Sequence, residues 1–173
     1  IKVPDGALTS KLQKIVPGDF VNVSDKATGS LLVENLTEGK DLWLLATGTG
    51  IAPFISMLSD EQTYKKFKNI HVVWSVRNEK ELNAFSGWLS GLGIDFIPIV
   101  TRDDRWQGVD MRITDLIKYG TILRGADPET DKIMLCGNMD FNKEVQSMIE
   151  QRGWIEGSNR QKGSYVLEKA FVG

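Results

Sequence analysis

The chain has 173 residues and a formal net charge of −2, with 41% hydrophobic and 25% charged residues. This length suits one domain, or one domain with part of another, and the composition is ordinary for a globular protein. The charge gives no basic surface for nucleic acid or a membrane, and no apolar run approaches the roughly 20 residues that span a bilayer. The only cysteine, Cys136, excludes a disulfide framework and cannot by itself hold an iron–sulfur cluster.

The first 40 residues differ in pattern from the rest of the chain. Leu8 to Ile15 predicts a short helix, and the apolar segments 21–23 and 31–33 predict two short strands. Two short strands cannot bury a core of their own. We therefore expect residues 1–40 to be the last part of an antiparallel β-barrel whose first part would precede Ile1.

Residues 41–173 are expected to form a second domain, in which strands and helices alternate. Near-continuous apolar runs are typical of parallel strands covered on both faces, and they predict strands at 42–46, 70–76, 95–101, 132–136 and 164–171. Helices are expected between them at 53–67, 79–91, 112–119 and 138–152. This order predicts an α/β fold with a five-stranded, doubly wound parallel sheet. Ligands of such sheets bind beyond the carboxyl ends of the strands, so candidate residues are sought there.

The first strand ends in a glycine turn, Thr47-Gly48-Thr49-Gly50, which is soon followed by Pro53. Glycines accept positive φ and let backbone N–H groups come close to a ligand, and a helix start favours an anion. Pro53 suits the first helical turn, although it replaces the third glycine of the dinucleotide fingerprint. We expect this turn to bind nucleotide phosphates; a tight turn without a ligand is the alternative.

Arginines follow the next two strands. Arg77 comes directly after Val76, where NAD-selective sites place a carboxylate for the ribose 2′-hydroxyl. Arg102 follows Thr101, and Arg112 opens the next helix. Guanidinium groups form charge-assisted, often bidentate bonds with phosphate, so this edge is expected to hold a 2′-phosphate. Ordinary solvated surface arginines are the alternative.

The fourth strand ends in Cys136 and Gly137, a small polarizable side chain followed by a residue that permits close approach. Simple burial is the alternative, because free cysteine is among the most buried residue types. His71, the only histidine, lies within a strand and is expected to be structural. The residue sets of hydrolases and of metal sites are missing, and no metal is expected. The aromatic Phe171 near the chain end could cover a flat ring system or pack against the sheet edge.

Together these residues resemble the ferredoxin (flavodoxin)–NADP⁺ reductases of bacteria. The resemblance covers essentially the whole chain in the family's order and rests on residues 4–10, 46–53, 76–77, 101–102, 111–113, 135–138 and 170–172. It implies a flavoenzyme with an FAD-binding barrel and an NADP-binding α/β domain. The Arg-x-Tyr-Ser flavin motif of the family does not occur in the chain, and the resemblance places that motif before Ile1.

The resemblance also implies a role for each candidate residue. Cys136 is the residue expected to take part in catalysis, beside the nicotinamide ring and not as a nucleophile. The NADP side would consist of Thr47, Gly48, Thr49, Gly50, Pro53, Val76, Arg77, Thr101, Arg102, Arg112, Cys136, Gly137, Asn138, Met139 and Asp140. The FAD side would consist of Ile1, Lys2, Val3, Leu8, Thr9, Ser10, Thr49, Ala170 and Phe171.

The implied reaction is hydride transfer between C4 of NADP(H) and N5 of FAD, followed by transfer of single electrons to a ferredoxin or flavodoxin. The carrier would dock on a basic patch, for which Lys11, Lys14 and Lys26 are candidates. We expect a cytoplasmic monomer that binds neither nucleic acid nor membrane. The alternatives are an NADH-using reductase of the same superfamily, a nucleotide-binding or electron-transfer subunit without catalysis, and an α/β domain that binds no nucleotide.

Overall fold

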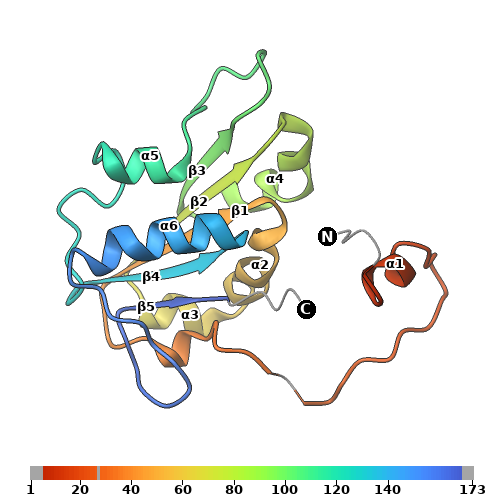
Figure 1. Ribbon diagram of the computed structural model, residues 1–173, viewed down its shortest axis with the longest axis horizontal. Coiled ribbons are helices and arrows are strands. Elements are labelled where there is room, and N and C mark those ends of the chain that lie inside the picture. Colours follow the sequence, from red (N-terminus) through yellow and green to blue (C-terminus); the bar gives the residue numbers. More distant parts are fainter. Residues whose placement is uncertain (1–5, 27, 169–173) are drawn as a thin grey trace.

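A sheet of five parallel strands forms the centre of the structure (Figure 1), a computed structural model that describes residues 6–26 and 28–168. The strands are β1 (Asp41–Thr47), β2 (Asn69–Val76), β3 (Asp95–Val100), β4 (Asp131–Cys136) and β5 (Tyr165–Leu167). They lie in the order β3-β2-β1-β4-β5, and every neighbouring pair is parallel. The predicted doubly wound parallel sheet is therefore confirmed.

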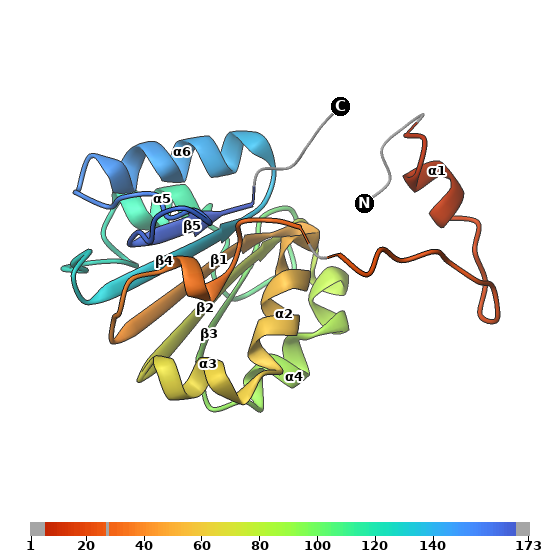
Figure 2. The same cartoon turned by 90° about the horizontal axis from the view of Figure 1, so that it is seen from below.

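Helices cover both faces of the sheet (Figure 2). One face carries α2 (Ala52–Leu58), α3 (Glu61–Lys66) and α4 (Ser86–Ser90), and the other carries α5 (Ile113–Lys118) and α6 (Met139–Glu150). The connections contain the 3-10 helices η1 (Val33–Asn35), η2 (Gly48–Ile51) and η3 (Glu79–Ala84). Over the ranges that the structure describes, no helix has the length and apolar character needed to cross a membrane.

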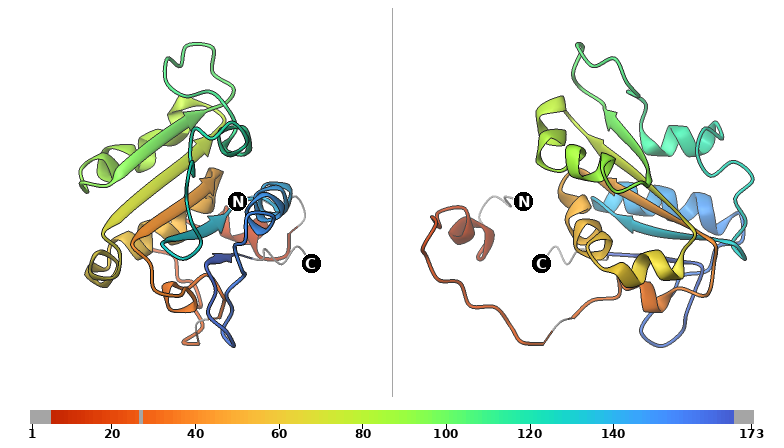
Figure 3. Two further views of the ribbon diagram at one scale, coloured as in Figure 1. Left: turned by 90° about the vertical axis from the view of Figure 1, so that its left-hand side faces the viewer. Right: turned by 180° about the vertical axis from the view of Figure 1, so that it is seen from behind.

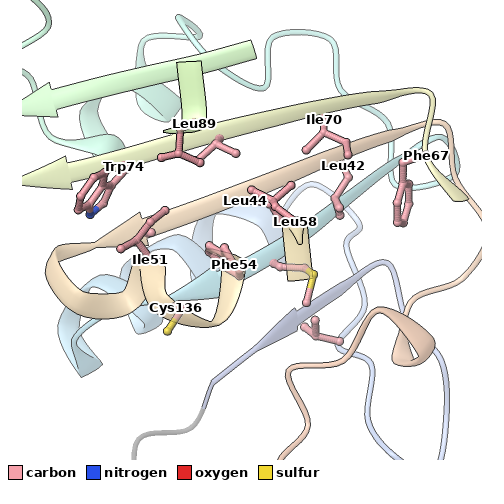
Figure 4. Close-up of a cluster of buried hydrophobic side chains, with 14 of the residues drawn as sticks. Leu42, Leu44, Ile51, Phe54, Leu58, Phe67, Ile70, Trp74, Leu89 and Cys136 are labelled. Carbon is pink, nitrogen blue, oxygen red and sulfur yellow. The ribbon is translucent and has the colours of Figure 1, made fainter. Parts of the chain in front are cut away.

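Two layers of apolar side chains hold the helices to the sheet. Because side chains alternate along a strand, β1 sends Leu44 and Ala46 to one layer and Leu45 to the other. Figure 4 shows the first layer, in which Phe54 of α2 packs with Leu44. These β1 side chains are fully buried, so the central strand contributes to both layers at once.

A polar row crosses the amino end of the sheet. Trp43 and His71 are register partners on β1 and β2, and their rings stack with centroids 4.0 Å apart. The Trp43 indole donates a hydrogen bond to Asp131 Oδ1 (3.0 Å), and His71 Nδ1 lies 2.8 Å from Asp95 Oδ2. The row thus links four neighbouring strands, which agrees with a structural role for His71.

Two of the predicted helices are divided in the structure. The segment 53–67 becomes α2 and α3 because Asp60 is extended (φ −97°, ψ 121°) and its carboxylate accepts a hydrogen bond from Gln62 N (2.9 Å). This contact is an N-cap, which starts a new helix. The segment 79–91 becomes η3 and α4, separated at Phe85, whose backbone (φ −141°, ψ −8°) is not helical.

Residues 6–26 form an N-terminal arm, which stands apart from the sheet in Figures 1 and 2 and in the right-hand view of Figure 3. The arm contains α1 (Thr9–Leu12), which is shorter than the helix expected over 8–15. Its hydrogen bonds include local ones, such as that from Ser10 N to Gly6 O (3.0 Å).

The strands predicted at 21–23 and 31–33 are wrong. Residues 21–23 have no regular structure, and Val33 begins η1. Among residues 6–26 and 28–168, no strand pairs with either segment. A short apolar segment stays extended as a strand only when a neighbour satisfies its backbone groups, and here that neighbour is missing.

We expect Leu44→Ala to lower the free energy of unfolding by about 2–5 kcal/mol, because it leaves a cavity in the centre of the sheet. The matched substitution Leu8→Ala should change it by less than about 0.5 kcal/mol, since Leu8 on the arm is 65% exposed. Urea unfolding followed by circular dichroism measures both. Equal losses would contradict the separation of the arm from the core.

Candidate nucleotide site

The strand order reverses between β1 and β4, because the chain adds β2 and β3 on one side of β1 and then β4 and β5 on the other. Connections leave the two strand ends in opposite directions there, and doubly wound sheets bind ligands in the resulting crevice. The β1 end continues into the glycine turn (Thr47–Gly50), and the β4 end continues into a second turn, the cysteine turn (Cys136–Asn138). These two turns are the centre of the candidate site.

The two turns touch through their glycines. A Cβ atom on Gly50 would lie 2.1 Å from Cys136 O, and one on Gly137 would lie 2.3 Å from Thr47 Oγ1. Any larger residue at either position would therefore force the turns apart. Gly48 differs, because its φ is +53° and no atom lies within 4 Å of its Cβ position. The backbone at Gly48 thus borders open space, where a ligand can approach closely.

The cysteine turn leads into α6. Asn138 caps this helix, because its Oδ1 accepts a hydrogen bond from Phe141 N (2.9 Å). Met139 and Asp140 are exposed in the first turn, and Pro53 lies in the first turn of α2, as predicted. The Asn138 side-chain oxygen is therefore used by the helix, while the exposed first turn of α6 borders the crevice.

Cys136 is buried at the end of β4, and its thiol donates a hydrogen bond to Glu168 Oε2 (2.8 Å). Burial, and then the Glu168 carboxylate, raise the pKa of the Cys136 thiol far above its ordinary range. The thiol is therefore protonated at neutral pH and is a poor nucleophile. This chemistry agrees with the expectation that Cys136 does not act by nucleophilic attack.

Arg77 and Arg102 lie at neighbouring strand ends, where Arg102 N donates to Arg77 O (2.8 Å). Arg112 directly precedes α5, after a loop that is tied to β3 by the bond from Val100 N to Val109 O (3.0 Å). All three arginines are exposed, and within the described ranges none of their guanidinium groups pairs with a carboxylate. Their charges are thus available to an anionic ligand.

A carboxylate also lies at this edge. Asp103 accepts a hydrogen bond from Arg105 N (3.2 Å), and its Oδ1 lies 3.6 Å from Arg105 Nε. The Arg105 backbone N–H lowers the pKa of Asp103 below its usual value, with a smaller contribution from the Arg105 side chain. Arg105 therefore pairs with Asp103, and Arg102 has no ion-pair partner among the described residues.

Val76 and Thr101 bond to each other. The Val76 side chain is buried, and its carbonyl accepts hydrogen bonds from both Thr101 N (3.0 Å) and Thr101 Oγ1 (3.1 Å). These bonds hold the ends of β2 and β3 together beside Arg77 and Arg102. They use the hydroxyl hydrogen of Thr101, and the Val76 side chain has no polar group. Val76 and Thr101 thus support the backbone next to Arg77 and Arg102.

The described residues of the predicted FAD side do not lie together. Leu8, Thr9 and Ser10 belong to the arm, apart from the sheet (Figure 3), while Thr49 is exposed in the glycine turn. The other residues expected on this side lie outside the described residues: Ile1, Lys2, Val3, Ala170 and Phe171. In the part of the chain that is described, no group of three His, Cys, Asp or Glu side chains could hold a metal ion.

Sequence reasoning missed two residues that contact the site. Glu168 accepts a hydrogen bond from the Cys136 thiol, and its carbonyl accepts one from Asn142 Nδ2 of α6 (3.0 Å). Trp74 Nε1 donates to Gly48 O (2.8 Å). The available signal was position: Glu168 follows the last strand, and Trp74 lies two residues before the end of the second.

We expect Gly50→Ala to lower the free energy of unfolding by about 1–3 kcal/mol or more, because the added methyl group meets the Cys136 backbone. Gly87→Ala is the matched control. Gly87 is exposed in α4 and has no atom within 4 Å of its Cβ position, so this change should be neutral or stabilise by up to about 1 kcal/mol. Urea titrations compare the two, and a neutral Gly50→Ala would contradict the tight contact.

We expect the Cys136 thiol to react with iodoacetamide roughly 100-fold more slowly in the native chain than in denaturant at about pH 8, because its raised pKa keeps it protonated. Glu168→Gln removes the neighbouring negative charge and should increase the native rate. Mass spectrometry of quenched samples measures both rates. A native rate equal to the denatured one would show that the thiol is accessible and ionised.

Comparisons with known proteins agree with this geometry. Residues 44–147 match the family model described as oxidoreductase NAD-binding domain. The chain is 38% identical over 192 residues to ferredoxin–NADP reductase A of Sorangium cellulosum, with 100% of the chain and 68% of that protein covered. It is 37% identical over 191 residues to the flavodoxin/ferredoxin–NADP reductase of Rhodobacter capsulatus, with 100% and 70% covered.

Among solved structures, the chain resembles a ferredoxin NADP⁺ reductase from Neisseria gonorrhoeae with bound FAD and NADP. The TM-score is 0.82 and the sequence identity 31%, over 96% of this chain and 70% of that one. The likeness thus extends over nearly all of this chain and leaves part of each relative unmatched.

Proposed function

Because the chain belongs to the bacterial ferredoxin (flavodoxin)–NADP⁺ reductase family and contains the NAD(P)-binding domain of these oxidoreductases, we propose that it moves electrons between NADP(H) and a ferredoxin or flavodoxin. The observation that carries this proposal is the contact of two glycine-containing turns at the switch point, beside three unpaired arginines. When bound, FAD would exchange a hydride with the nicotinamide and single electrons with the carrier.

The residues of the site fit a nucleotide that carries a 2′-phosphate. Arg77, Arg102 and Arg112 would hold that phosphate, since they supply positive charge after β2, after β3 and before α5, and in the described chain none of them is in an ion pair. The open backbone at Gly48 and the exposed first turn of α6 would hold the rest of the nucleotide.

Cys136 would border the nicotinamide as a neutral group. Its thiol is protonated and bonded to Glu168, so it keeps a fixed position and adds no charge next to the ring. Since a small side chain at this place permits close approach, Cys136 and Gly137 would together set how the ring lies against the flavin. Thr49, exposed in the opposite turn, would lie on the flavin side.

The electron carrier would dock near the arm. Lys11, Lys14 and Lys26 are exposed there, and ion pairs with an acidic carrier would speed and orient the encounter. This assignment is independent of the nucleotide site, because the three lysines lie on the arm, whereas the three arginines follow β2 and β3 or precede α5.

We expect Arg77→Ala to weaken NADP⁺ binding by about 1.5–3 kcal/mol, the size of a hydrogen bond to a charged group. Binding of NAD⁺, which lacks the 2′-phosphate, should change little. Calorimetric titration of the chain with each nucleotide measures the difference.

The control for this experiment is Arg124→Ala, which removes an exposed arginine from the segment after α5. It should leave both affinities unchanged. An equal loss for NADP⁺ and NAD⁺ in Arg77→Ala would remove the proposed basis of selectivity. A wild-type preference for NAD⁺ would favour an NADH-using reductase.

A further inference from the structure

We propose that Trp74 is a positioning residue for the glycine turn. Its indole fixes the Gly48–Thr49 peptide so that the Thr49 N–H points away from the core, toward the nucleotide. The inference rests on the nucleotide binding proposed above, and it assigns the role to a side chain of the neighbouring strand.

Trp74 reaches the turn from β2. Its Cα pairs in register with Ala46 of β1, just before the turn begins. The side chain is 3% exposed, and Figure 4 shows it in the apolar layer beside Ile51, at the end of the sheet. From this buried place its Nε1–H donates to Gly48 O at 2.8 Å. The Gly48 carbonyl therefore points into the layer.

The direction of that carbonyl decides the direction of the next amide. The described chain contains no cis peptide bond, and in a trans peptide the C=O and N–H groups point in opposite directions. With Gly48 O directed into the core, Thr49 N–H is directed outward. Thr49 is exposed, and the Cβ position of Gly48 beside it borders open space. In the proposal, the outward Thr49 amide meets a ligand at this turn.

Without the indole, the peptide between Gly48 and Thr49 would have more freedom. Gly48 has a φ of +53° and no neighbour at its Cβ position, so it is held by the short 3-10 helix η2 that it begins and by the bond from Trp74. Reversing the peptide would leave the buried Trp74 donor without its acceptor, and an unpaired buried donor is costly. The hydrogen bond thus selects one orientation of the peptide.

The chain supplies a matched control in Trp43. Its indole also donates to a single acceptor, Asp131 Oδ1 (3.0 Å), but at the amino end of the neighbouring strand. Trp43→Phe and Trp74→Phe therefore each keep an aromatic ring and each remove one indole hydrogen bond. Only Trp74→Phe removes it from the glycine turn.

The first experiment is calorimetric titration of the wild type and both variants with NADP⁺ and with NAD⁺, alongside thermal unfolding. Trp74→Phe should weaken both nucleotides by the same factor, about 3- to 10-fold, because the turn contacts the part that they share. Trp43→Phe should stay within about 2-fold of wild type. Unchanged affinity in Trp74→Phe, or an equal loss in Trp43→Phe, overturns the proposal.

The second experiment needs no nucleotide. In ¹H–¹⁵N spectra, the Thr49 amide should shift clearly in Trp74→Phe and stay in place in Trp43→Phe; an unmoved Thr49 amide in Trp74→Phe overturns the proposal. If the wild type binds neither nucleotide while the amide shifts, the proposed function fails, but the proposal that Trp74 fixes the Gly48–Thr49 peptide is supported.

If Trp74→Phe does not fold, the wild-type spectrum decides. The Trp74 indole proton should exchange far more slowly than that of Trp88, which is 39% exposed, and rapid exchange overturns the proposal.

Discussion

The contact between the glycine turn and the cysteine turn determines the candidate site. Both turns end central strands of a parallel sheet, and they can meet only because Gly50 and Gly137 have no side chains. Where they meet, the strand order reverses, and the crevice, the buried Cys136 thiol and the open backbone at Gly48 all lie at that point. The edge of the sheet that carries Arg77 and Arg102 is built differently, since backbone bonds at the strand ends, such as that from Arg102 N to Arg77 O, hold it in place.

Sequence patterns were sufficient for the sheet because each central strand is buried on both faces. The apolar runs that end at Ala46, Val76 and Cys136 are typical of strands covered on both faces, and the observed strands match them within one or two residues. The two short strands in the first 40 residues failed for the opposite reason. An isolated apolar triplet is a strand only in the presence of a partner, and the sequence does not say whether there is one.

The positions of the candidate residues were predictable where they follow a strand directly, and the contacts between neighbouring strands were not. Glycines, arginines and the cysteine lie in turns directly after strands, so their place could be inferred from the switch-point rule. The roles of Glu168, Trp74 and Thr101 arise from bonds between strands, to Cys136, Gly48 and Val76. Predicting such contacts requires knowledge of the strand order and of the direction of each side chain, and a local sequence motif gives neither. Asp60 similarly ended a predicted helix by capping the next one.

The Cys136 thiol has a consequence for oxidative stress. Peroxide attacks thiolates, and sulfenic acid formation is the first step of cysteine oxidation. A thiol that is buried, protonated and bonded to Glu168 is slow to take that step. Since the chain has no second cysteine, an oxidised sulfur could not be captured as an internal disulfide. Burial and protonation thus protect the Cys136 thiol at the centre of the site from oxidation.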